Sequence, residues 1–248
     1  MKKYLILLCL IFSSYSYTQV KPIKETVIKK DDQKLKITGF GKLQLGMSVS
    51  DLDELKEAKE MTSYIDYVMK VYRKIDNKTV YEQIFDSTKV QRSFASPNNK
   101  VRIFTVPKIK ITDNIALILV ELKFYEDKLY DILCNTNTDV DEALTFKYGA
   151  PKIEKKVEEK KFTYTNTGNT VTKIENTYTS TWNTNDTNID CHSYIRNLFD
   201  NEGKESYISF IKLNNMSIVD NVYVFEKKYF VAEKIKKEAL KKAKLSGF

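Results

Sequence analysis

The sequence predicts an α+β fold: a mostly antiparallel sheet of six or more strands, with two short packed helices and a basic C-terminal helix. Apolar residues fill positions 115–120 and then alternate with charged ones, as in a buried strand. Residues 162–195 are rich in threonine, asparagine and tyrosine and are divided by turn sequences, which favours hairpins. Between these regions, residues 138–151 carry the start and stop signals of a helix.

The composition is that of a globular protein. The chain has 248 residues, of which 42% are hydrophobic and 30% charged. A folded unit of this size buries roughly 70–75% of its unfolded surface, so its core needs no metal or disulfide to form. This composition excludes collagen-like, coiled-coil and multi-span membrane proteins.

The first eighteen residues predict export. Lys2 and Lys3 precede an apolar run from Tyr4 to Phe12, and small polar residues follow. Nine apolar residues are too few to span a bilayer, which takes about 20. Cys9 follows leucines instead of the small residues that precede a lipid-modified cysteine. We expect a signal peptide at residues 1–18, cleaved near 16–18, and a periplasmic or secreted protein.

Two regions follow the signal peptide. Residues 19–35 are charged and lack apolar periodicity, so we expect a solvated leader, and residues 36–248 form a single α+β domain. In that domain, residues 36–45 predict a strand interrupted by glycines. Ser48 or Ser50 then caps a helix with an aspartate three residues on.

Residues 61–95 carry few clear helix or strand signals. Residues 64–71 are compatible with a helix or a strand, and residues 81–85 predict a short strand. A turn at residues 96–99 leads into a strand over residues 101–111, where Pro107 indicates an edge or a bulge because proline cannot donate to a ladder.

The later elements have clearer signals. Residues 115–134 predict a hairpin that reverses at 125–128, and the helix from Thr138 ends at Gly149 and Pro151. Strands are predicted at 160–166, 171–182, 189–196 and 206–213. From Tyr229 a lysine-rich helix carries a narrow apolar stripe, formed by Ala232, Ile235, Ala239 and Ala243.

Cys134 and Cys191 remain after processing, in a compartment that permits disulfides. The sequence leaves two alternatives open: a disulfide between them, or two unpaired buried thiols. Closing this loop would stabilise the fold by about 4 kcal/mol on the chain-entropy model.

No catalytic residue, metal ligand set or cofactor is predicted. Adjacent strand residues point to opposite faces, so Cys191 and His192 cannot form a dyad. Asp186, Asn188 and Asp190 imitate the first ligands of a calcium loop, whose glycine and terminal glutamate are missing. A hydrolase using scattered carboxylates remains the alternative to a binding protein.

Two features suit binding. The evenly spaced aromatic residues Phe162, Tyr164, Tyr178 and Trp182 would grip a glycan or peptide if their strand face were exposed, and would otherwise form core. The terminal helix has eight lysines and three glutamates after residue 225. This surplus of positive charge favours peripheral contact with anionic lipid. The alternative is a solvated helix whose apolar stripe rests on the domain. Export disfavours nucleic acid as a partner.

Three segments resemble a known fold. Gly41–Ser48 (GKLQLGMS) is similar to the opening strand and helix start of the SmpA/OmlA (BamE-like) and beta-lactamase-inhibitor-like proteins, and Leu122–Leu129 (LKFYEDKL) resembles their following strand pair. Lys147–Pro151 (KYGAP) with Trp182 resembles longer versions in exported bacterial proteins of unknown function. The resemblance implies a shared architecture. The expected function is a non-enzymatic binding or envelope-associated module whose partner is an envelope protein or a glycan.

Overall fold

The computed structural model describes residues 35–73, 76–88, 94–136, 138–163, 168–200 and 203–245. The predicted signal peptide, and the predicted leader up to residue 34, lie outside the described residues. The described residues form an α+β fold with one large sheet and three α-helices, α1 (Tyr64–Tyr72), α2 (Thr138–Tyr148) and α3 (Met216–Leu245).

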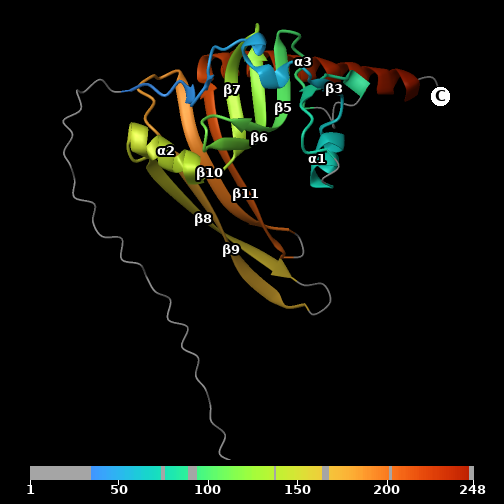
Figure 1. The fold of residues 1–248 in the computed structure, drawn as a ribbon. Coiled ribbons are helices and arrows are strands. Elements are labelled where there is room, and N and C mark those ends of the chain that lie inside the picture. Colours follow the sequence, from blue (N-terminus) through green and yellow to red (C-terminus); the bar gives the residue numbers. More distant parts are fainter. Residues whose placement is uncertain are drawn as a thin grey trace, which may run out of the picture. The chain divides into compact units, whose positions relative to one another are not determined.

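The large sheet has nine strands in the order β3-β4-β5-β6-β7-β11-β10-β9-β8 (Figure 1). Every neighbouring pair is antiparallel except β3 and β4, so the prediction of a mostly antiparallel sheet is confirmed. The strands are β3 (Lys59–Met61), β4 (Tyr81–Gln83), β5 (Val101–Lys110), β6 (Ala116–Tyr125), β7 (Lys128–Asn135), β8 (Lys152–Thr163), β9 (Thr170–Thr181), β10 (Ile189–Phe199) and β11 (Glu205–Asn215).

One face of the sheet, which we call the core face, carries the main core. Phe104, Leu122 and Phe124 are fully buried there. Helix α2 covers part of this face through Val140 and Leu144. The predicted boundaries of α2 are confirmed, and it ends where predicted because the next residue, a glycine, has a φ of +92°.

The segment before residue 56 also packs on the core face, in shorter elements than predicted. Residues 36–45 form a small hairpin, β1 (Gly39–Phe40) and β2 (Leu43–Gln44), because Gly41 has a φ of +57° and turns the chain. The predicted capped helix is a pair of 3-10 turns, Val49–Asp51 and Asp53–Leu55. The backbone N–H of Ser48 donates to the Asp51 carboxylate at 2.7 Å, as a capping box requires.

The β5–β6 pairing shows how the sheet accommodates Pro107. The register runs from Val106 opposite Val120 to Lys108 opposite Ile118, and Leu119 has a φ of +50°. Strand β4 pairs with β5 only up to Thr105, so no ladder on that side needs the missing donor. Of the two predicted alternatives the structure has the edge, because the β5–β6 register is the same on both sides of Pro107.

The opposite face of the sheet, which we call the second face, carries Thr105, Glu121 and Lys123, each next to a core-face residue in sequence. Helix α1 packs here, with the ring of Tyr67 edge-on to Tyr81 at 5.6 Å between centroids. Its first turn is capped by Ser63, whose hydroxyl accepts from the Asp66 backbone N–H at 3.4 Å. The alternative left open for residues 64–71 is therefore settled as helix.

Helix α3 is longer than the sequence predicted, because it begins at Met216 directly after β11. Its early turns pack through Ile218, Val219 and Val222 on the second face, and their contacts there include Tyr130. Beyond residue 230 nearly every side chain is exposed, including the whole predicted apolar stripe. The interpretation of that stripe as resting on the domain is wrong, because the packing residues lie at the other end of the helix.

Strand β8 also begins earlier than predicted, at Lys152 instead of residue 160. Its first half is charged and lacks an apolar alternation, and it forms a strand through its ladder to β9. Together with β9–β11 it makes a long four-stranded arm (Figure 1).

Candidate functional site

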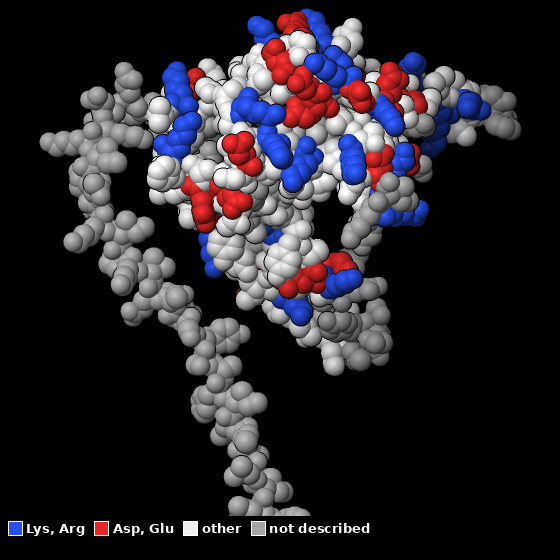
Figure 2. Space-filling view, in the orientation of Figure 1, with Lys and Arg blue, Asp and Glu red and all other residues white. Residues whose placement is uncertain are grey.

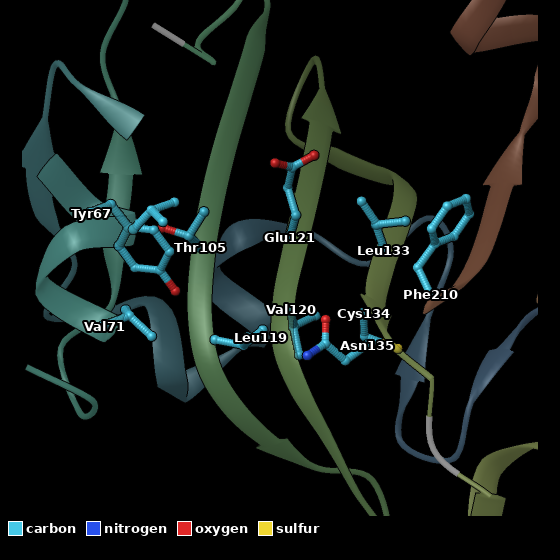
Figure 3. A pocket seen from close by; sticks show the side chains of 11 residues that line it. Tyr67, Val71, Thr105, Leu119, Val120, Glu121, Leu133, Cys134, Asn135 and Phe210 are labelled. Carbon is cyan, nitrogen blue, oxygen red and sulfur yellow. The ribbon is translucent and has the colours of Figure 1, made fainter. Parts of the chain in front are cut away.

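A cavity of about 300 Å³ lies between α1 and the second face of the sheet. Figure 3 shows Tyr67 and Val71 of α1 on one side, Phe210 and Leu133 on the other, and Glu121 between them. Its walls are Tyr67, Val68, Val71, Thr105, Leu119, Val120, Glu121, Leu133, Cys134, Asn135 and Phe210.

The walls are mainly apolar, with a few polar groups. The Thr105 hydroxyl is engaged within the protein: it accepts from the Gln83 side-chain amide at 3.2 Å and donates to the Tyr81 carbonyl oxygen at 3.4 Å. The other polar side chains of the wall are Glu121 and Asn135. Glu121 is the one carboxylate among the described residues that line the cavity.

Glu121 belongs to a chain of buried and partly buried charges that continues across the second face. The Lys123 Nζ lies 3.0 Å from the Glu121 Oε1 and 3.8 Å from the Asp131 Oδ2. The Lys212 Nζ lies 3.5 Å from that same Asp131 oxygen. Two carboxylates and two ammonium groups therefore balance one another on three neighbouring strands, β6, β7 and β11.

Burial and the neighbouring charges shift the pKa values of Asp131 and Lys123. Burial raises the pKa of Asp131 against the opposing charges of Lys123 and Lys212. Burial favours neutral Lys123, yet the charges of Glu121 and Asp131 outweigh it and raise its pKa. Asp131 faces Asn214 across the β7–β11 ladder, and the Oδ1 atom of each is buried without a hydrogen-bond partner.

Aromatic rings and a histidine extend the same face beyond the cavity. The rings of Phe210 and Tyr194 are stacked, with centroids 5.0 Å apart, and the His192 ring lies 5.9 Å from Phe210. The His192 Nδ1 is 2.6 Å from the Asp190 Oδ2. Cys191 lies in the main core, so His192 and Cys191 point to opposite faces as predicted.

The predicted aromatic face is not assembled. Phe162 is 7% exposed and its ring lies against Phe199, whereas Trp182 is 3% exposed and lies in the main core. Tyr178 is 39% exposed, and Tyr164 lies outside the described residues. In the β8–β9 register Phe162 pairs with Val171 and Tyr178 with Lys155, so the two rings lie far apart along the hairpin.

Cys134 and Cys191 are free, buried thiols, so the disulfide alternative is not formed. Cys134 is opposite Ile211 and Cys191 is opposite Leu213, which places β11 between them. Strands on either side of a shared neighbour lie roughly 9.5 Å apart, beyond the 7 Å limit for bridged Cα atoms. Burial raises the pKa of each thiol to about 12.

Sequence reasoning missed the cavity residues. The alternation in residues 120–124 does place Glu121 and Lys123 on the face opposite Leu122, and that signal could have identified them as second-face residues. Their association with Tyr67 and Phe210 has no local signal, because α1 and β11 are far away in the sequence.

Within the described part of the chain, no group of three or more His, Cys, Asp or Glu side chains is arranged to hold a metal ion. No described helix is both long and apolar enough to span a membrane. Comparison of the chain with protein-family models, curated proteins and solved structures finds no match, so the resemblance to SmpA/OmlA proteins stays a prediction.

Proposed function

We propose that this protein is an exported, non-enzymatic binding module that holds an apolar ligand in the cavity between α1 and the sheet. The observation that carries the proposal is a cavity of about 300 Å³ with mainly apolar walls. Ligand sites typically have about 300–1,000 Å³, apolar walls and a few polar groups that orient the ligand.

The walls indicate the chemistry of the ligand. Val71, Leu133 and Phe210 offer an aromatic or branched aliphatic group a surface of matching polarity. Glu121 and Asn135 are the polar wall groups that can orient a hydrogen-bond donor on the ligand. The ligand is therefore a small molecule or peptide side chain with an apolar body.

The alternative, a carboxylate-dependent hydrolase, fits this geometry less well. Such enzymes place two carboxyl groups on either side of the bond that is cleaved. Here the Lys123 ammonium bridges Glu121 and Asp131, and Asp131 is also held by Lys212. The pair is occupied by internal salt bridges, which supports binding over hydrolysis.

The cavity proposal is tested by titrating the protein with the neutral apolar fluorophore N-phenylnaphthylamine. Filling the cavity with Val71→Trp should weaken binding by roughly tenfold or more, equivalent to at least about 1.4 kcal/mol. Val224→Trp, on an exposed position of α3, is the matched control and should bind as the unchanged protein does. Equal binding by both variants would contradict the proposal.

Helix α3 supports the envelope association that the sequence suggests. Its exposed C-terminal half presents Val231, Ile235 and Leu240 together with many lysines. Figure 2 shows acidic and basic side chains interspersed over the visible face of the molecule. By contrast, α3 has eight lysines and three glutamates after residue 225. We propose that this helix rests on anionic lipid headgroups.

Sedimentation with vesicles tests that contact. The protein should sediment with phosphatidylglycerol vesicles, and should stay in solution with phosphatidylcholine vesicles or in high salt. Replacing Lys236, Lys237 and Lys241 with glutamine should abolish sedimentation. Export is tested separately by N-terminal sequencing of the protein recovered from the exporting cell, which should begin between about residues 17 and 19.

A further inference from the structure

Strand β8 is the last strand of the large sheet, and its outer edge is unpaired among the described strands. It has twelve residues, all but a few of them exposed, and its ladder to β9 runs along its full length. Its outward N–H and C=O groups therefore form a long edge to which another strand can be added. Charged side chains on an edge strand usually discourage such pairing. The order of the charges along β8 therefore determines which strand can pair with it.

The order of the charged residues along β8 is self-complementary. We propose that two copies of the protein pair along β8, antiparallel, about a two-fold axis at Val157 that is perpendicular to the sheet. In this register every charged residue that faces a charged residue meets one of opposite sign. The facing pairs, each formed twice, are Glu154 with Lys160, Lys155 with Glu159, and Lys156 with Glu158.

Neighbouring registers do not share this property. A two-fold axis perpendicular to the sheet keeps the two faces distinct, so the register can shift only by moving the axis to another residue. With the axis at Lys156, that lysine faces its own copy, and Glu154 faces Glu158. With the axis at Glu158, glutamate faces glutamate there and Lys155 faces Lys161. Like charges directly opposite one another are destabilising, so Val157 is selected as the centre.

An exposed apolar patch lies around the same axis. Ile153, Val157, Ile174 and Tyr178 are 64%, 53%, 51% and 39% exposed. Tyr178 pairs with Ile195 of β10, and alternation from the buried Cys191 places all four on the core face. The axis at Val157 brings the two patches together into one apolar surface.

Two of the facing residues of β8 are also held by neighbouring strands: Lys160 Nζ lies 3.5 Å from Oε1 of the buried Glu175, and Arg196 Nη2 lies 3.1 Å from Glu158 Oε2. Lys156 Nζ lies 2.8 Å from Glu158 Oε1, and the two side chains are 69% and 41% exposed. Exposed pairs of this kind contribute little to stability, so their side chains can exchange partners at small cost. The dimer adds backbone hydrogen bonds and six facing charge pairs, three counted twice, to the edge.

A charge exchange tests the register by sedimentation velocity. The variant Lys155→Glu/Lys156→Glu and the variant Glu158→Lys/Glu159→Lys should each be monomeric, because like charges then face one another. Mixed together they should form a heterodimer, because each glutamate then faces a lysine. Lys236→Glu/Lys237→Glu on α3 carries the same change in net charge as the first variant and should remain dimeric.

Cysteine cross-linking gives an independent test that does not require a charge change. In a Cys9→Ser background, Val157→Cys should form a disulfide-linked dimer under mild oxidation, because the two Cys side chains face each other across the axis. Glu154→Cys, on the same strand, faces residue 160 of the other copy and should not cross-link. A monomeric unaltered protein, a mixture that stays monomeric, or equal cross-linking by both variants would overturn the proposal.

Discussion

Lys123 lies on the second face between two carboxylates, Glu121 and Asp131, of which Asp131 also has Lys212 as a partner. The Lys123 side chain is 28% exposed, and the side chains of Glu121 and Asp131 are 14% and 3% exposed. Removing one partner of a buried ion pair typically costs about 3–5 kcal/mol, because the remaining charge is left uncompensated. The sequence alternation places Lys123 on this face, but its partner Asp131 follows from the pairing of β6 with β7.

Replacing Lys123 with methionine should therefore destabilise the protein strongly. The substitution keeps a long apolar side chain and removes the charge, which leaves Glu121 without its ammonium partner and leaves Asp131 with Lys212 alone. We expect the free energy of unfolding to fall by about 3 kcal/mol or more in urea denaturation at neutral pH. Lys56→Met is the control, because its partner Asp53 is exposed, and it should leave stability essentially unchanged. Similar losses in the two variants would contradict this account.

Asp76 should contribute to stability in a defined pH range. Hydrogen bonds from Thr79 and from the Tyr81 hydroxyl lower the pKa of Asp76 from 3.8 to about 2. Because the pKa in the folded state is depressed, this stabilisation is complete above about pH 4 and is lost as the pH falls towards 2.

The measurement is urea denaturation of the unchanged protein and of Asp76→Asn at a series of pH values. The unchanged protein should be the more stable above about pH 4, and the difference should shrink between about pH 4 and pH 2. A difference that does not vary over that range would show that the Asp76 carboxylate has an ordinary pKa.

At the scale of the elements, the sequence signals of a helix or strand predict its bounds correctly where residues of the same segment are also buried against the rest of the fold. Helix α2 has both its stop signal and two buried residues, Val140 and Leu144, and its boundaries agree with the prediction. The first half of β8 and the first half of α3 were missed because the first half of β8 is charged and the packing residues of α3 lie in its early turns. Their extents depend on neighbours: the β9 ladder holds β8, and the second face holds α3.

The β1–β2 turn offers a test of one such tertiary contact. Gly41 and Gly168 both have positive φ, at +57° and +67°, so alanine strains the backbone at either position. At Gly41 the added Cβ would also lie 2.3 Å from the Ile111 carbonyl oxygen, whereas at Gly168 it meets no atom of the described residues within 4 Å. We expect Gly41→Ala to cost about 1–3 kcal/mol more than Gly168→Ala in thermal or urea unfolding. Equal costs would show that the hairpin can move away from Ile111.

At the scale of the whole molecule, strand order decides which distant residues meet. Strand β11 is inserted between β7 and β10, so Cys134 and Cys191 share a core without bonding, and Phe210 reaches the cavity beside Leu133. The same order leaves β8 at an edge. Insertion of the last strand into the middle of a sheet cannot be recognised from hydrophobic periodicity, which reports only the face on which a residue lies.

Thiol reactivity tests this strand order. In a Cys9→Ser chain without reductant, dithionitrobenzoate should fail to react with the native protein, because Cys134 and Cys191 are buried and their pKa values are raised to about 12. In denaturant both thiols should react. An unfolded chain with no reactive thiol would indicate a disulfide and a different arrangement of β7, β10 and β11.

The sequence by itself determined the fold class, the β6–β7 hairpin, helix α2 and the edge position of Pro107, because each depends on alternation, turn residues or helix signals within a short segment. Only the tertiary structure decided that Phe162 and Trp182 are buried, that the cysteines stay apart, and that α1 closes a cavity against β6 and β11. These outcomes depend on which strands become neighbours, and that choice is made by the burial of surfaces far apart in the chain.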